Sequence, residues 1–286
     1  MKIRVFTGRS LTHRLMQETF SANSTLGSAP FMNFIAAGLS DVGRHREHNE
    51  DSFCILPEHR LFIVADGMGG HRAGDVASKM ATHAIASFFE ATSSDDATWP
   101  FSFDPHLSVD ENRLLTGIKI ANRKIFDASV KHREVHGMGT TVVSILLSRD
   151  RGQTFIAHVG DSRAYRVRNG AIELMTRDHS LVNDYLMVMP DMTPEQVAEL
   201  PKNVITRALG MQDSVAVDLL PDAPQPGDVY VLCSDGLNGM IEDAVINDIA
   251  ARAGDDMEQL VADLVKEANA NGGDDNVTVV AVLITA

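Results

Sequence analysis

The chain has 286 residues and a hydrophobic fraction of 44%, which suits one large domain or two small ones with a sizeable core. Its formal net charge of −14 argues against nucleic acid as a main partner, because phosphate backbones are bound by Lys and Arg. No apolar run reaches the roughly 18 residues that span a bilayer, so we expect no membrane anchor. Cys54 and Cys233 lie in apolar stretches, and we interpret them as buried thiols in a reducing, cytoplasmic compartment.

Residues 1–31 differ in composition from the rest of the chain. They are rich in Ser, Thr and Arg, and Glu18 is their only acidic residue. This composition is compatible with a targeting peptide. We favour a disordered tail or an overextended start, since Met32 could equally begin the folded domain. The prediction is therefore an N-terminal extension over residues 1–31 and a single domain over residues 32–286.

Short apolar runs, turns and amphipathic segments alternate from residue 33 onward. Apolar runs between turn residues predict strands at 34–39, 53–56, 61–65, 141–147, 154–159, 164–168, 172–175, 215–219, 229–233 and 277–284. Apolar residues at helical spacing predict helices at 75–90, 114–125, 242–252 and 256–270. Strands joined by the tight turns at 149–152 and 168–170 must pair in antiparallel fashion. The predicted fold class is therefore α+β with antiparallel sheets.

Two segments show neither the apolar runs of a strand nor the apolar spacing of a helix. Residues 92–105 are rich in Ser, Asp and Pro and predict a loop. Residues 180–203 contain several Met and Pro residues without a clear period, and we predict a mobile flap there.

Acidic clusters stand at the ends of four predicted strands. They are Asn49-Glu50-Asp51, Asp66-Gly67, Ser234-Asp235-Gly236 and Asp274-Asp275-Asn276. Each alone is most simply a turn. Together they place carboxylates at the edge of the core, where unpaired charge is costly, and no Cys or His cluster accompanies them. Oxygen ligands of this kind suit Mg²⁺ or Mn²⁺ better than Zn²⁺.

Six ordered motifs resemble those of the PPM family, the metal-dependent type 2C Ser/Thr protein phosphatases, in its bacterial form. The motifs are Gly43-Arg44-His45-Arg46-Glu47-His48-Asn49-Glu50-Asp51-Ser52, Val64-Ala65-Asp66-Gly67-Met68-Gly69-Gly70-His71, Gly139-Thr140-Thr141, Val159-Gly160-Asp161-Ser162-Arg163-Ala164-Tyr165, Ser234-Asp235-Gly236-Leu237 and Asp274-Asp275-Asn276-Val277-Thr278. The resemblance implies an α-β-β-α sandwich, in which two antiparallel β-sheets pack face to face and are flanked by helix pairs. It also implies a hydrolase that removes phosphate from phosphoserine and phosphothreonine in proteins.

The resemblance further implies a site with two divalent cations, Mn²⁺ or Mg²⁺. Asp66 is expected to bridge both ions and the carbonyl of Gly67 to complete one site, while Asp235 and Asp275 hold the other ion. Glu50 and Asp51 are expected to act mostly through metal-bound waters. Two cations about 3.5–4 Å apart can share a hydroxide that attacks phosphorus in line with the leaving oxygen.

Arg46 is the expected phosphate anchor, because a guanidinium can bind two phosphate oxygens at once. Arg44 is a weaker competitor, and a surface salt bridge is the alternative role for either residue. We therefore expect Arg46, Asp66 and Asp235 to be catalytic. Thr140 and Thr141 are expected to orient water in the site, or simply to begin a strand.

Two positions depart from the family pattern. Asp161 is expected to help hold a third, weaker ion, but Gly239 stands where the family often has a further aspartate, which makes that ion doubtful. Met68 follows the Asp-Gly pair where animal relatives have a histidine, and a thioether cannot donate a proton. His71 and His179 are alternative general acids, and a metal-bound water is another.

Two other functions stay open. A catalytically silent relative that binds phosphoproteins is suggested only by Gly239. A hydrolase of a small phosphorylated metabolite is allowed, because a fold does not fix its substrate. The favoured hypothesis is a monomeric, cytoplasmic signalling enzyme that opposes a bacterial Ser/Thr kinase and acts on its phosphorylated protein substrates.

Overall fold

The computed structural model describes residues 3–7, 33–69, 73–92, 101, 103–149, 152–201 and 204–286. Two six-stranded sheets form its centre. The first contains, in order, β1 (Ile3–Thr7), β2 (Asn33–Asp41), β12 (Val277–Thr285), β11 (Val229–Cys233), β8 (Arg163–Arg168) and β9 (Ala171–Leu174). The second contains β10 (Asp218–Asp222), β7 (Thr154–Val159), β6 (Val142–Leu147), β4 (Leu61–Met68) and β3 (Asp51–Leu56), with β5 (Gly139–Thr140) paired to β4. All described pairs are antiparallel except β1 with β2.

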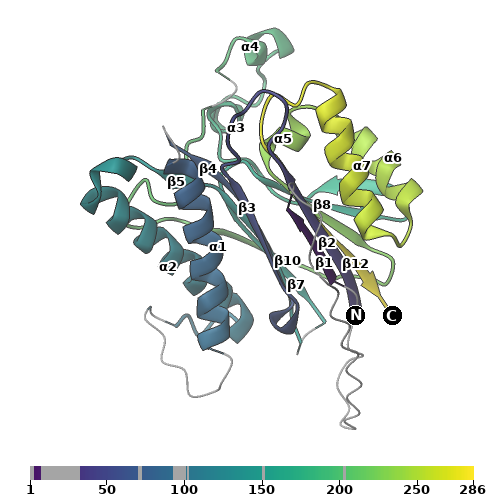
Figure 1. The fold of residues 1–286 in the computed structure, drawn as a ribbon, viewed down its shortest axis with the longest axis horizontal. Coiled ribbons are helices and arrows are strands. Elements are labelled where there is room, and N and C mark those ends of the chain that lie inside the picture. Colours follow the sequence, from purple (N-terminus) through teal and green to yellow (C-terminus); the bar gives the residue numbers. More distant parts are fainter. Residues whose placement is uncertain are drawn as a thin grey trace.

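Helices cover the outer face of each sheet (Figure 1). Helices α1 (Ala73–Ala91) and α2 (Val109–Lys131) pack on the second sheet. Helices α6 (Asp243–Ala253) and α7 (Met257–Ala270) pack on the first, with the short α5 (Asp235–Asn238) beside them. This arrangement confirms the predicted α+β class and the sandwich of two sheets between helix pairs.

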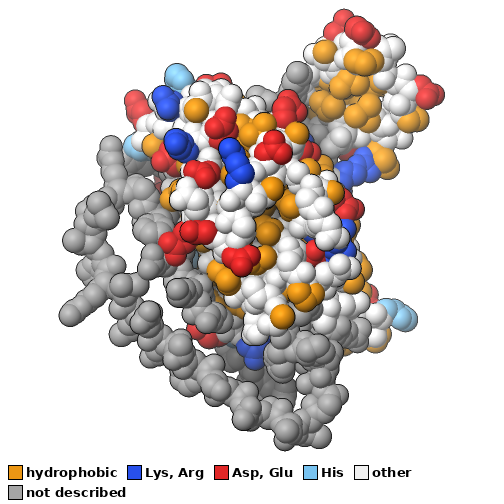
Figure 2. Space-filling view, turned by 90° about the vertical axis from the view of Figure 1, so that its right-hand side faces the viewer, with side chains coloured by type: hydrophobic (Ala, Val, Ile, Leu, Met, Phe, Trp, Pro, Cys, Tyr) orange, Lys and Arg blue, Asp and Glu red, His pale blue; other side chains and the backbone are white. Residues whose placement is uncertain are grey.

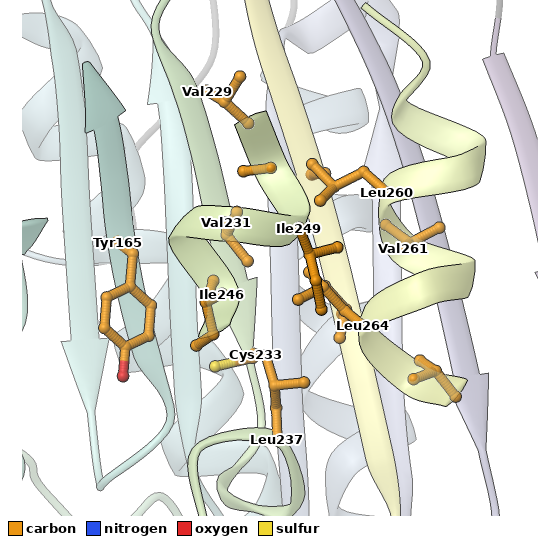
Figure 3. Packing of buried hydrophobic residues seen from close by; sticks show 14 of the residues in the cluster. Tyr165, Val229, Val231, Cys233, Leu237, Ile246, Ile249, Leu260, Val261 and Leu264 are labelled. Carbon is orange, nitrogen blue, oxygen red and sulfur yellow. The ribbon is translucent and has the colours of Figure 1, made fainter. Parts of the chain in front are cut away.

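The inner strands β4, β6, β7, β11 and β12 are buried on both faces, which explains why their sequences are almost continuously apolar. In β12, Val279 and Ala281 face α7, whereas Val280 and Val282 face the other sheet. Figure 3 shows the outer layer of this core, where residues of β11 such as Val231 meet side chains from α6 and α7. The sandwich therefore has three apolar layers, and charged groups are confined to its ends and surface.

Side chains cap the first turns of α2 and α7. Ser108 caps α2 by accepting a hydrogen bond from the Glu111 N–H, while the Glu111 carboxylate accepts one from the Ser108 N–H. Asp256 is the N-cap of α7, and its Oδ1 accepts a hydrogen bond from the Gln259 N–H over 3.0 Å. At the β8–β9 turn, Asn169 and Gly170 have φ of 53° and 77°, the left-handed pair that a two-residue hairpin requires.

Three predicted segments differ from the structure or lie partly outside it. The flap contains two unpredicted helices, α3 (Leu181–Val188) and α4 (Pro194–Ala198), and its residues 202–203 lie outside the described residues. The strand predicted at 215–219 lies instead at β10, which includes Pro221 and tolerates it as an edge strand. Most of the loop predicted at 92–105 is also outside the described residues.

The predicted N-terminal extension is described only over residues 3–7, where strand β1 lies along β2. The rest of residues 1–31 falls outside the described residues, so the domain boundary remains a prediction. In the described part of the chain, none of the helices has the length and apolar character needed to cross a membrane. Both cysteines are free thiols, as predicted, with Cys233 buried and Cys54 half-buried.

Candidate functional site

Acidic residues from both sheets converge at one end of the sandwich, the end that carries α5 in Figure 1. Strands β3 and β12 begin there, and β4, β7 and β11 end there. Antiparallel pairing therefore brings together side chains that are far apart in sequence. The residues at these strand ends are Asp51, Asp66, Asp161, Asp235 and Asp275.

A hydrogen bond between the two sheets fixes the centre of this cluster. Asp51 and Asp66 are directly paired in the register of β3 and β4, so their side chains share one face. Ser234, at the end of β11 in the other sheet, donates from Oγ to Oδ2 of Asp51 over 2.7 Å. The Asp66 and Asp235 carboxyls also share a hydrogen bond. Carboxylates of the two sheets thus form a single site.

The main chain of Asp66 is held on both sides. Its N–H donates to Thr141 Oγ1 over 3.0 Å, and its carbonyl accepts from the Thr141 N–H and from Thr140 Oγ1, each over 2.8 Å. Thr140 lies in the short strand β5, in keeping with the strand start given above as the alternative to orienting water, and both threonine hydroxyls contact the backbone of Asp66. Thr141 Oγ1 also lies 2.7 Å from Ser162 Oγ, which connects Asp66 to the turn that carries Asp161.

Asn276 holds the loop that carries Arg46 and Glu50. Its Oδ1 accepts from the Glu50 N–H over 2.8 Å, and its Nδ2 donates to the carbonyls of Val42 and His48 over 2.9 and 3.0 Å. This buried amide was part of a recognised motif, but its role was missed, because nothing local to residue 276 indicates contacts more than 220 positions away.

Close backbone packing surrounds Gly67. A Cβ on Gly67 would lie 2.0 Å from the carbonyl oxygen of Gly74 and 2.6 Å from that of Glu50. The Gly67 N–H donates to the Glu50 carbonyl over 3.2 Å, and the Gly74 N–H donates to the Glu50 carboxylate. The first turn of α1 is therefore pressed against the loop before β3, and only glycine fits at this contact.

Burial and mutual repulsion raise the pKa values of the clustered carboxyls. Burial, followed by the charges of Asp51 and Asp235, raises the pKa of Asp66 well above its usual range. Burial raises the pKa of Asp51 to about 7, against the hydrogen bond from Ser234. Burial and Asp235 raise the pKa of Asp161 to about 7. Such a set is unfavourable in the ionised form unless positive charge is added.

Several of these oxygens also lack hydrogen-bond partners. Among the described residues, one carboxylate oxygen each of Asp51, Asp161 and Asp235 is buried with no donor nearby. Buried acceptors of this kind are normally satisfied. Clustered carboxylate oxygens are the ligands that Mg²⁺ and Mn²⁺ prefer. The residues therefore fit divalent cations in both charge and donor type.

Arg46 lies at the exposed rim of the cluster. Its Nη2 donates to Asp275 Oδ2 over 2.6 Å and its Nε lies 3.4 Å from the carbonyl oxygen of Asp274. The guanidinium is half-exposed, so part of its donor set faces solvent.

Gly239 ends α5 at the surface, beside the site, and offers no side-chain ligand. His71 lies outside the described residues.

A second group of metal-ligating residue types lies around strands β7 and β10. One ligand atom each from His158, His179 and Asp218 lies within 4.8 Å of the others. Arg207 Nη1 occupies the same place, however, at 2.6 Å from Asp218 Oδ1 and 2.9 Å from His179 Nε2. His179 Nδ1 accepts from the Gly160 N–H over 3.0 Å, so the proton of the neutral ring lies on Nε2. A protonated Nε2 beside a guanidinium disfavours a cation at this position.

The chain is similar in sequence and fold to known proteins. A family model described as Protein phosphatase 2C matches residues 43–279. The serine/threonine phosphatase stp of Listeria welshimeri is 34% identical over 252 residues, which are 85% of this chain and 93% of that protein. The solved structure of Stp1 from Staphylococcus aureus has a TM-score of 0.76 and 32% identity, covering 93% of this chain and all of that one.

A third relative bears on the metal ions. The catalytic domain of the phosphatase PstP, solved in complex with two manganese ions, has a TM-score of 0.74 and 30% identity, covering 89% of this chain and 100% of that chain. The sequence match, the shared sandwich and the cluster of carboxylates agree with one another. The chain therefore belongs to the protein phosphatase 2C family, and it is a metal-dependent serine/threonine protein phosphatase of the bacterial type.

Proposed function

We propose that the carboxylate cluster hydrolyses phosphoserine and phosphothreonine in proteins with the help of two Mn²⁺ or Mg²⁺ ions. The observation that supports this proposal is the convergence of five aspartates from both sheets, three of which have buried oxygens without donors. The two manganese ions of the PstP structure support the number and kind of ions. The substrates are phosphoproteins, as in the relatives, and a bacterial Ser/Thr kinase would supply them.

Asp66 would serve both ions, because it lies between Asp51 of its own sheet and Asp235 of the other. The carbonyl of Gly67 and the carboxylates of Asp235 and Asp275 would complete the ligand set, and Glu50 and Asp51 would act through water. When bound, the ions supply a water of lowered pKa and neutralise charge on the phosphoryl group. Asp161 would contribute to a weaker third position that lacks a partner at Gly239.

Arg46 would orient the phosphate. In the described structure its guanidinium bonds the rim carboxylate of Asp275 and keeps exposed donors. A phosphoryl group at the cluster would receive two parallel hydrogen bonds from such a group, and Lys cannot reproduce that geometry. Because Arg46 is half-exposed at the rim, a phosphate on the side chain of a large protein substrate could reach it.

The test is phosphate release from a phosphothreonine peptide with and without Mn²⁺. Asp66→Asn is expected to abolish release, because an amide removes the bridging negative charge. Asp255→Asn is the matched control, since Asp255 is exposed in the turn between α6 and α7. Calorimetric titration with Mn²⁺ is expected to show tight binding that Asp66→Asn weakens and Asp255→Asn leaves unchanged.

The same assay separates the alternatives. Release from small phosphate esters that is much faster than release from the peptide would indicate a metabolite hydrolase. Mn²⁺ binding without any release would indicate a silent phosphoprotein-binding relative. Either result would contradict the proposed activity.

A further inference from the structure

Two methionine side chains meet beside the carboxylate cluster, where the proposed chemistry gives them no role. Met68 follows Asp66 by two positions, so the alternation of β4 puts both side chains on one face of the strand, about 7 Å apart along it. Met68 pairs with Gly139 of β5, and a Cβ on Gly139 would lie 3.5 Å from Met68 Cγ and 3.4 Å from Met211 Sδ. Gly139 is therefore the floor between two thioethers, and we call Met68, Gly139 and Met211 the thioether patch.

The main chain on each side of Met211 is held by hydrogen bonds. Leu209 exchanges two backbone hydrogen bonds with the short strand β5, over 2.8 and 3.1 Å. Asn122, a buried amide of α2, accepts from the Gly210 N–H over 2.9 Å and donates to the Gln212 carbonyl over 3.1 Å. The backbone that presents Met211 is thus fixed from two directions without any ligand.

This fixed backbone leaves apolar surface uncovered. Met211 is 58% exposed although its neighbour Leu209 is fully buried, and Met68 is half-buried. Single exposed apolar side chains are common, but adjoining ones rimmed by polar groups are typical of a binding surface. Thioether side chains are flexible and polarisable, so they adapt to apolar partners of different shape. The patch is therefore suited to a varied set of apolar side chains.

We propose that the thioether patch binds an apolar side chain of the phosphoprotein substrate that lies within two residues of the phosphorylated Ser or Thr. The inference rests on the proposed function, because the carboxylate cluster would fix where the phosphate lies. An extended chain advances about 3.3 Å per residue, so two residues span the distance between Asp66 and Met68. The cluster selects the phosphate, and the patch selects the sequence beside it.

Steady-state kinetics with short phosphothreonine peptides tests the patch. Leu or Ser is placed in turn at each of the two positions on either side of the phosphothreonine. At one of these positions Leu is expected to raise kcat/KM of the wild type about 4- to 15-fold over Ser, the effect of burying one or two methylene groups. Met211→Ser is expected to remove this preference by raising KM for the Leu peptide with kcat unchanged, whereas Met211→Leu keeps it.

Met187→Ser is the matched control, because Met187 is a 64% exposed methionine of α3 in the flap. This variant is expected to keep the preference for Leu. Hydrolysis of a small phosphate ester, which has no neighbouring residue, is expected to be equal in the wild type and in Met211→Ser. Equal ester hydrolysis shows that the carboxylate site of the variant is intact.

A wild type with no preference for Leu at any of these positions would overturn the patch. Persistence of the preference in Met211→Ser would do the same, and its loss in Met187→Ser would assign it to the flap instead. A wild type that releases no phosphate from any peptide would contradict the proposed function. Fluorescence anisotropy of the labelled, uncleaved peptides on the same Mn²⁺-loaded protein would then decide the patch from the ratio of the Leu and Ser Kd values.

Discussion

Asp51 and Asp66 stand directly opposite each other on neighbouring antiparallel strands, both in a cluster of further carboxyls. Like charges placed opposite each other destabilise a sheet. Here burial adds to that cost and raises the pKa of both groups. The pairing is therefore unfavourable for the sheet and becomes favourable when cations are bound.

The stability of the metal-free protein is expected to depend on pH through Asp51. Its folded pKa is about 7, raised by burial from an ordinary value near 4, so the folded state holds a proton that the unfolded state has released between these pH values. The stability that the protonated Asp51 carboxyl allows is fully present below about pH 4 and is lost as the pH rises through about 7. Each pH unit in this window costs at most about 1.4 kcal/mol for one group.

Urea unfolding in EDTA between pH 5 and pH 8, for the wild type and for Asp51→Asn, checks this dependence. His158 works in the opposite direction, because burial lowers its pKa to about 4 and its stabilising contribution grows with pH. The difference between the two proteins reports Asp51 together with its effect on the neighbouring Asp66 carboxyl. A difference that does not change with pH would contradict the expected titration.

Arg46→Ala is expected to reduce kcat/KM for a phosphopeptide by about 10- to 150-fold, since a hydrogen bond to a charged group contributes about 1.5–3 kcal/mol. Arg46→Lys should recover only part of the loss, because an ammonium cannot form the two parallel bonds. Arg44→Ala is the control, as its side chain is equally exposed on the same loop. Steady-state kinetics would contradict the assignment if Arg44→Ala were the more damaging change.

Two glycine substitutions are expected to have opposite effects. Gly67→Ala forces a methyl group within 2.0 Å of the Gly74 carbonyl oxygen and should weaken Mn²⁺ binding and activity by separating α1 from the site. Gly117→Ala lies inside α2, where the nearest atom to a new Cβ is Ile85 Cγ2 at 3.4 Å. It should stabilise the protein by up to about 1 kcal/mol, the helix-propensity difference. Thermal unfolding and Mn²⁺ calorimetry distinguish the two cases.

Leu264→Ala is expected to destabilise the protein by about 2–5 kcal/mol, the range for removing a large buried aliphatic side chain. Leu264 is fully buried between α7 and the first sheet (Figure 3). Folded Leu264→Ala protein should retain the Mn²⁺ affinity of the wild type, because the carboxylates lie at the end of the sandwich. Chemical denaturation together with calorimetry measures both quantities.

The strongly patterned elements were predictable from the sequence. Strands β7 and β11 have the predicted boundaries, and the Asn169-Gly170 turn joins β8 to β9 as expected. Helices α3 and α4 were missed because they are only eight and five residues long and none of their residues is fully buried. Figure 2 shows hydrophobic side chains gathered on the projecting part of the surface, and Tyr185, Met187, Val188 and Met189 of the flap are exposed.

The candidate site was predictable only in part. The acids were recognisable because apolar strands run directly into Asp66 and Asp235. The partners of these acids were not, since Ser234 reaches Asp51 across 183 positions and Asn276 reaches Glu50 across 226. The contacts of His179 with Gly160 and of Asp178 with Arg163 were not predictable either, because they depend on the connection from β7 to β8 in the other sheet, whose packing no local pattern specifies.

The central position of β12 has a consequence for biosynthesis. This strand lies between β2 and β11, pairing residues 33–41 with residues 277–285, and the adjoining Asn276 holds the loop of Glu50. A ribosome that has released only the first 270 residues therefore carries a chain whose first sheet is incomplete and whose acidic site is unassembled. The nascent enzyme cannot act on phosphoproteins during its own translation until residue 285 has been made, and such distant pairings also make folding slow.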